Sequence, residues 1–121
     1  MTRLVGQRGE AVVVTFLQNQ GFKILETNYR QFFGEIDIIA QRDNVLSFIE
    51  VKARKNSMVS LHELVTPVKQ RKIILVAKTF ISKQRNMPEE MVYRFDVALV
   101  YVHDNDCEIT YIPNAFAVSE Y

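Results

Sequence analysis

Apolar residues recur along this chain with two different periods, and the period predicts which segments are helices and which are strands. Between residues 6 and 20 they return at helical spacing, and Gly21 predicts the end of that helix. A second helix is predicted to begin after Thr66, a favourable N-cap residue, with Pro67 at its first position. The remaining apolar runs are short and rich in β-branched and aromatic residues, which predicts strands over residues 22–30, 33–40, 45–52 and 92–102 and a short edge strand over 107–112.

This order of elements, helix-strand-strand-strand-helix-strand, predicts an α/β fold with a mixed central sheet flanked by helices. A right-handed crossover through the second helix would place the fourth strand parallel to a strand of the preceding hairpin. The chain has 121 residues, 48% of them hydrophobic and 24% charged, which is ordinary globular composition. We therefore expect one domain over residues 1–121.

The two strands at 33–40 and 45–52 are predicted to form a hairpin, because residues 41–44 between them are turn-forming. If Asp43 and Asn44 are a two-residue loop, the numbers of paired residues have a constant sum, and Asp37 lies opposite Glu50 with Cβ atoms about 5 Å apart. A four-residue loop keeps this pairing. A three- or five-residue loop would put the two carboxylates on opposite faces.

Charged residues interrupt these otherwise apolar strands, and a buried charge needs a partner. In the favoured register Glu35, Asp37, Glu50 and Lys52 all project from one face. Two such close carboxylates repel, so one would take up a proton unless a cation lies between them. Mg²⁺ and Mn²⁺ prefer such oxygen ligands. The alternative is a structural ion network in which Lys52 neutralises one carboxylate.

Asp37 followed by Glu50-x-Lys52 resembles the signature of the PD-(D/E)XK nucleases, the restriction-endonuclease-like superfamily, although Ile36 stands where a proline usually precedes the aspartate. A closer resemblance covers nearly the whole chain and is to the YraN-like family of small bacterial proteins. It is carried by seven segments in order: Arg8-Gly9-Glu10, Asn28-Tyr29-Arg30, Gly34-Glu35-Ile36-Asp37, Phe48-Ile49-Glu50-Val51-Lys52, Lys69-Gln70-Arg71-Lys72, Arg94-Phe95-Asp96-Val97 and Ile112-Pro113-Asn114-Ala115-Phe116. In most members a glycine-containing loop follows the lysine strand, whereas residues 57–64 here contain no glycine.

The resemblance implies a single-domain restriction-endonuclease-like fold and a nuclease site. Mg²⁺ or Mn²⁺ would be held by Asp37, Glu50 and the backbone carbonyl of Val51, and Lys52 would act on the attacking water or the developing charge. The resemblance also implies that Glu10 supplies a fourth acidic group from the first helix. It implies that Lys69 approaches the site from the second helix.

Net charge is only +1, but its distribution is uneven. Residues 52–85 hold nine basic residues and a single acidic one, whereas the C-terminal third is acidic. This asymmetry is typical of a local surface that faces nucleic acid, and a solvated helix face is the alternative. The candidate phosphate-contacting residues are Lys55, Lys69, Arg71, Lys72 and, from the first strand, Arg30.

Other function classes find no support. No apolar run could span a membrane, the N-terminal residues lack the apolar core of a signal peptide, and Cys107 is the single cysteine, so we expect a cytoplasmic protein. No phosphate-binding glycine loop is present, which argues against a nucleotide or other small-molecule cofactor. The aromatic residues are mostly spaced as core residues, not as a base-stacking platform.

We therefore expect a metal-dependent nuclease whose partner is nucleic acid, with DNA favoured over RNA and branched or processed DNA among the candidate substrates. A homodimer stays open. The competing hypothesis is a nucleic-acid-binding or interaction module with an idle site, and a metal-stabilised structural protein is a third class.

Overall fold

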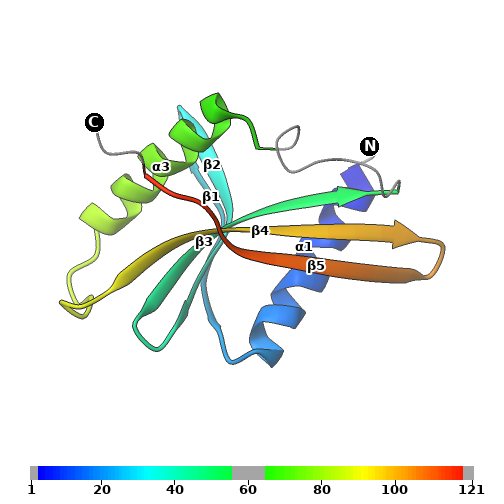
Figure 1. Cartoon of the computed structure of the whole chain (residues 1–121), viewed down its shortest axis with the longest axis horizontal. Coiled ribbons are helices and arrows are strands. Elements are labelled where there is room, and N and C mark those ends of the chain that lie inside the picture. Colours follow the sequence, from blue (N-terminus) through cyan, green and yellow to red (C-terminus); the bar gives the residue numbers. More distant parts are fainter. Residues whose placement is uncertain (1–2, 56–64, 119–121) are drawn as a thin grey trace.

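A computed structural model describes residues 3–55 and 65–118 (Figure 1). The segment 57–64, where the resemblance implied a glycine-containing loop, therefore lies outside the described residues. The described elements follow the predicted order and end with the predicted edge strand. They are α1 (Arg3–Asn19), β1 (Lys23–Gln31), β2 (Gly34–Arg42), β3 (Val45–Arg54), α3 (Pro67–Ser82), β4 (Val92–His103) and β5 (Asp106–Phe116).

The strands form one five-stranded sheet in the order β1-β2-β3-β4-β5. β3 and β4 run parallel and all other neighbours run antiparallel, so the mixed sheet and the parallel crossover strand are confirmed. Thr66 caps α3 as predicted, because its side chain accepts a hydrogen bond from the Lys69 N–H, and Pro67 is the first helical residue. This arrangement is the core of a restriction-endonuclease-like fold.

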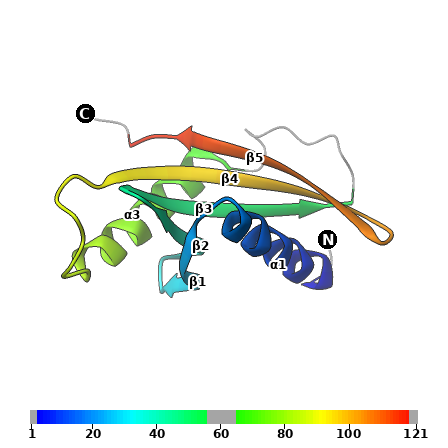
Figure 2. The same cartoon turned by 90° about the horizontal axis from the view of Figure 1, so that it is seen from below.

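The two helices cover opposite faces of the sheet (Figure 2). Ile39 and Phe48 pack with the buried face of α3, whereas the adjacent Ile38 and Ile49 pack with α1. This alternation along β2 and β3 is the period-two pattern of a strand that is buried on both faces. Neither helix is long and apolar enough to cross a membrane.

The β2–β3 hairpin has the predicted register. A two-residue turn at Asp43 and Asn44 joins the strands, and Ile38 pairs with Ile49, which keeps the predicted constant sum. The paired residues end there, although β2 begins at Gly34 and β3 continues to Arg54. The strands therefore lose their ladder at the position of Asp37 and Glu50.

β5 is longer than the predicted edge strand at 107–112, because a bulge carries it to Phe116. The β4–β5 register shifts between Phe95 and Val97, and the fully buried Asp96 lies at that shift. Its carboxylate accepts hydrogen bonds from the Asn114 N–H at 2.8 Å, from the Tyr111 hydroxyl and from Arg94. Asp96 thus replaces the ladder partner that the bulged strand lacks, and its role here is structural.

A close approach of α1 to β3 depends on Gly9. A Cβ atom at this position would lie 2.7 Å from the Cβ of Ala53, closer than real Cβ atoms come. The absence of a side chain lets α1 lie directly against β3 and sets the position of the next residue, Glu10.

We predict that Gly9→Ala destabilises the fold by about 1–3 kcal/mol, the usual cost of overpacking. Because the clash is with one atom, Ala53→Gly should relieve it. Urea unfolding of the four proteins of this double-mutant cycle measures the coupling. The close approach would be disproved if Gly9→Ala lowered the free energy of unfolding equally in the wild-type protein and in the Ala53→Gly background.

Candidate functional site

Asp37 lies just beyond the end of the β2–β3 hydrogen-bond ladder, and its side chain accepts a hydrogen bond from the main chain of β3. The Val51 N–H of β3 donates to the Asp37 carboxylate at 2.8 Å. On the other side, Asn28 of β1 stands opposite Asp37, between the pairs Thr27–Ile38 and Tyr29–Ile36, and has a φ of 52°. The carboxylate is thereby held between strands rather than in solvent.

Glu50 lies on the adjacent strand and is the buried acidic group of the site, only 6% exposed. Its Oε1 is 2.8 Å from Nζ of Lys69 and 3.2 Å from Nζ of Lys52. The structure therefore brings Asp37, Glu50, Val51, Lys52 and Lys69 together, with Lys69 arriving from the first turn of α3.

The electrostatics of the pair match the repulsion expected from its spacing. Burial raises the pKa of Asp37 to about 7, with the nearby Glu50 charge adding to the shift and the Val51 hydrogen bond opposing it. Burial also raises the pKa of Glu10, and the charges of Glu35 and Glu50 add to that effect. Glu10 on α1 thus belongs electrostatically to the same cluster as the carboxylates of β2 and β3.

The two lysines respond in opposite directions. Burial lowers the pKa of Lys52, and the neighbouring Lys69 lowers it further. Burial is the largest influence on the pKa of Lys69 and acts to lower it, but the hydrogen bonds to Glu50 and Lys52 and the charges of Glu50 and Asp37 together outweigh burial, so the net shift is upward. Lys69 therefore holds its proton for Glu50, whereas Lys52 is the more readily deprotonated of the two.

The donor set fits a hard divalent cation that keeps several waters. Asp37 and Glu50 supply two carboxylates, and Glu10 Oε1 is buried without a hydrogen-bond partner. Within residues 3–55 and 65–118 no three acidic, histidine or cysteine side chains are close enough to enclose an ion. Mg²⁺ is characteristically bound by one or two carboxylates plus water and substrate phosphate, and such a site needs no third side chain.

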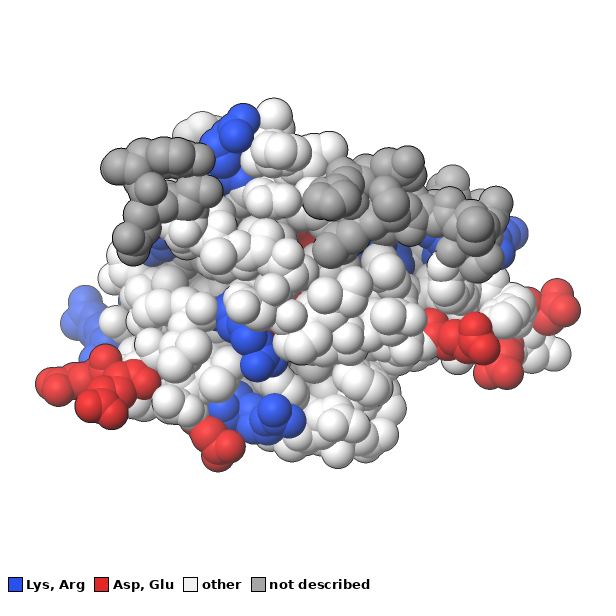
Figure 3. Space-filling view, in the orientation of Figure 1, with Lys and Arg blue, Asp and Glu red and all other residues white. Residues whose placement is uncertain are grey.

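The predicted phosphate-contacting residues do not form one patch. Lys69 is in the carboxylate cluster, and Lys72, one turn later on α3, lies beside Gly34, whose added Cβ would be 3.5 Å from the Lys72 Cβ. Arg30 pairs with Glu35 across the β1–β2 hairpin. Arg71 instead lines a groove of about 540 Å³ on the outer side of α3, together with Lys78 and Val118. The face in Figure 3 accordingly shows separated basic clusters, with most acidic side chains at its two ends.

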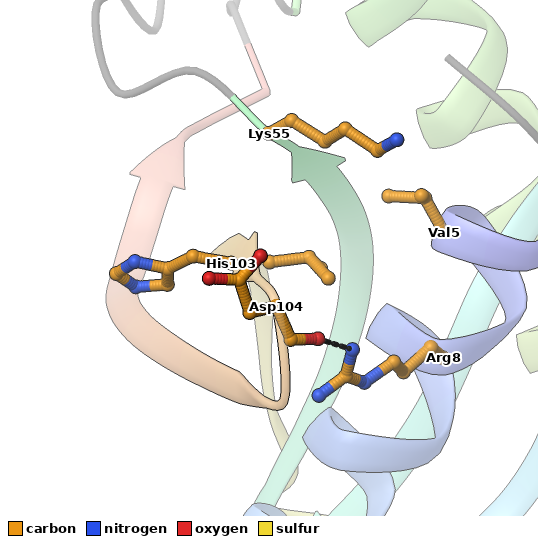
Figure 4. Close-up of a pocket in the computed structure, with 6 residues that line it drawn as sticks. Val5, Arg8, Lys55, His103 and Asp104 are labelled. Carbon is orange, nitrogen blue, oxygen red and sulfur yellow. Dashed lines mark hydrogen bonds between the residues drawn. The ribbon is translucent and has the colours of Figure 1, made fainter.

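Lys55 lies in a different cavity, beyond the end of β3. This cavity of about 510 Å³ is also lined by Val5 and Arg8 of α1 and by His103 and Asp104 at the β4–β5 turn. Figure 4 shows Lys55 and Arg8 at opposite edges of it, with Arg8 donating to the Asp104 carbonyl at 3.1 Å. Lys55 is therefore separate from the carboxylate cluster, and its predicted contact with nucleic acid stays a prediction.

One surface residue near the site escaped the sequence analysis. Phe32 is fully exposed at the tip of the β1–β2 hairpin, five residues before Asp37. An aromatic residue next to another apolar residue suggests burial, so sequence pattern gave no signal. Phe32 and Phe33 form the two-residue turn between Gln31 and Gly34. Placing a turn at these two residues would have predicted that Phe32 is exposed.

Comparisons with known proteins agree on one family. The family model described as "Uncharacterised protein family UPF0102" matches residues 9–100. A UPF0102 protein of Vibrio parahaemolyticus is 42% identical over 116 residues, covering 95% of this chain and 93% of its own. A UPF0102 protein of Geotalea daltonii is also 42% identical, over 94% and 90% of the two chains, and one of Desulforapulum autotrophicum is 44% identical over 93% and 92%.

We predict that Asp37→Asn stabilises the metal-free protein. The pKa of Asp37 is raised on folding, so ionising its carboxyl group destabilises the folded protein. This destabilisation is zero below about pH 4 and reaches its full size above about pH 7. Asparagine keeps an acceptor for the Val51 N–H but carries no charge. The gain should therefore grow between pH 4 and 7, to a limit on the order of 4 kcal/mol.

Urea unfolding in EDTA at pH 5 and pH 8 measures this gain. Asp43→Asn is the matched control, because it is the same substitution made at an exposed position in the hairpin turn. An Asp37→Asn protein no more stable than wild type at pH 8 would show that the buried carboxylate is not repelled as described.

Proposed function

The chain belongs to the UPF0102 family, and from the chemistry of its site we propose that it is a divalent-metal-dependent nuclease acting on nucleic acid, with DNA the favoured substrate. The observation that carries the proposal is the convergence of Asp37 and Glu50 beside Lys52, with the pKa of Asp37 raised to about 7. A structural ion pair would lower the pKa of its carboxylate. Here burial first, and then the charges of Glu50, Glu10 and Glu35, raise the pKa of Asp37, as in a site prepared for a cation.

Asp37, Glu50 and the Val51 carbonyl are the groups that would hold the ion, with Glu10 as an outer acidic group. Bound Mg²⁺ or Mn²⁺ would polarise a phosphate oxygen and lower the pKa of a water molecule. Lys52 lies 3.2 Å from Glu50, and it would donate to the attacking water or to a phosphate oxygen as negative charge develops there. Lys69, which pairs with the same Glu50 oxygen as Lys52, would keep Glu50 oriented.

One observation favours a competing function. Glu50 is already paired with two lysines, so part of the cluster is neutralised without any metal. This arrangement supports a nucleic-acid-binding or interaction module that keeps the fold but turns nothing over. The two functions differ in what Lys52 does, and this difference makes them separable.

We predict that Asp37→Asn and Glu50→Gln abolish divalent-dependent cleavage, because each removes an anionic ligand. Lys52→Ala should lower kcat by roughly 10²–10³ with Mn²⁺ affinity unchanged, since it removes transition-state stabilisation alone. Cleavage is measured with Mg²⁺ and Mn²⁺ on duplex, single-stranded, flapped and four-way-junction DNA. Lys78→Ala, the same change on the far side of α3, is the control.

Two results would contradict the nuclease proposal. One is a carefully purified wild type that cuts no substrate of the panel. The other is a Lys52→Ala protein that is less stable but has no specific loss of turnover, because that is the behaviour of a residue that only neutralises Glu50.

We also predict that nucleic-acid affinity falls steeply with salt, because lysine and arginine side chains displace counterions from phosphate. Lys72→Glu should weaken binding more than Arg71→Glu, since Lys72 lies on the hairpin side of α3 and Arg71 in the outer groove. Each lost phosphate contact should reduce the slope of log K against log salt by about 0.9 for duplex DNA. A salt-independent affinity that neither reversal alters would make these residues an ordinary solvated helix face.

A further inference from the structure

The tip of the β1–β2 hairpin presents one aromatic side chain to solvent in a braced position. Phe32 is 100% exposed, while the adjacent Phe33 is partly buried and packs against the core beneath α3. The two rings meet edge to face, with centroids 4.9 Å apart and planes at 90°. Phe33 thus anchors the turn and Phe32 stands out from it.

The hairpin tip is also held from the side. An added Cβ at Gly34 would lie 3.2 Å from a methyl carbon of Val76 and 3.5 Å from the Lys72 Cβ, so the strand rests directly on α3. Arg30 and Glu35 pair across the two strands next to the turn. A fixed ring loses little freedom when a ligand covers it, which favours binding.

The charges around Phe32 are those expected for a polyanion. Arg30 precedes it by two residues and its side chain is 74% exposed. Lys72 lies beside Gly34, and Lys69, one turn earlier on α3, reaches Glu50. Two separate basic residues therefore lie near the hairpin tip, Arg30, which is paired with Glu35, and Lys72 on α3.

The size of the feature selects the kind of ligand. A stable protein partner normally covers about 800 Å² on each side, far more than one ring at a hairpin tip offers. One nucleobase, by contrast, has a flat face that matches a single aromatic ring, and each such stack contributes about 1–3 kcal/mol. Phe32 lies in the turn before β2 and precedes Asp37 by five residues, a span of at most roughly 17 Å for extended chain, or about five base steps of duplex.

We propose that Phe32 is a base-stacking residue of this site, and that the substrate carries an unpaired or unstacked base within about five base steps of the bond to be cut. Duplex bases are already stacked on one another, so a ring at this distance gains a partner only where the duplex ends, branches or opens. This inference rests on the proposed nuclease function and narrows its substrate to flapped, branched or single-stranded nucleic acid.

The test measures base contact separately from cleavage. The chain has no tryptophan, so Phe32→Trp introduces a single fluorophore at the tip. In EDTA, its emission should be quenched by a flapped or single-stranded oligonucleotide. Tyr93→Trp is the control, because Tyr93 is 43% exposed at the start of β4, where it pairs with Leu46 at the opposite end of β3 from Lys52.

Affinity supplies the second measurement. Phe32→Ala should bind flapped DNA roughly 5- to 150-fold more weakly, the loss expected for one stack, whereas Phe32→Trp should bind like wild type and affinity for intact duplex should barely change. The unfolding midpoint of Phe32→Ala should lie close to that of wild type, because the side chain is fully exposed and the substitution removes only an exposed edge-to-face contact with Phe33.

The inference is overturned if Phe32→Ala binds flapped DNA as tightly as wild type, or if bound oligonucleotide leaves the Phe32→Trp emission unchanged. It is also overturned if Phe32→Ala alters only self-association in sedimentation. Cleavage by wild type together with any of these results would leave the nuclease proposal standing. Quenching and weakened binding without cleavage would instead support the base contact and refute the nuclease.

Discussion

The central constraint in this protein is negative charge placed inside a β-sheet. Asp37 and Glu50 stand on neighbouring strands where water is largely excluded, and burial together with their repulsion raises the pKa of Asp37 to about 7. The sheet tolerates Asp37 by giving up its own ladder beyond Ile38 and Ile49, so that the carboxylate can accept the Val51 N–H. A local break in the hydrogen-bond ladder is thus the structural counterpart of the buried charge.

The rest of the fold compensates for that charge from both faces. α3 begins at a capped turn that brings Lys69 to Glu50, while β3 itself supplies Lys52. From the other face, the close packing of Gly9 against Ala53 adds a further acid, Glu10, whose Oε1 is buried and unpaired. Two lysines against three acids leave a negative cluster, and this excess of acid is the basis of the proposed cation site.

Much of this was predictable from local pattern. The hairpin register followed from a two-residue turn, because the constant sum of paired numbers holds from Arg42 and Val45 to Ile38 and Ile49; the end of the ladder before Asp37 and Glu50 was not predicted. The meeting of Lys69 with Glu50 depends on where α3 crosses the sheet, which periodicity cannot specify and only family resemblance implied. The full length of β5 was missed because Pro113 and Asn114 suggest a strand end. In the structure the Asn114 N–H instead donates to Asp96, and the strand continues past a bulge at this point. Phe32 was missed because residue type indicates burial but cannot tell which two residues form a turn.

Proton release on metal binding tests the central claim most directly. Calorimetric titration with Mn²⁺ at pH 6, 7 and 9, in buffers of different ionisation enthalpy, gives the number of protons displaced per ion. If the ion binds between Asp37 and Glu50, release should approach one proton at pH 6, fall to about half at pH 7 and vanish at pH 9, because Asp37 titrates near 7. Binding without proton release at pH 6, or binding that survives unchanged in Asp37→Asn, would contradict the account.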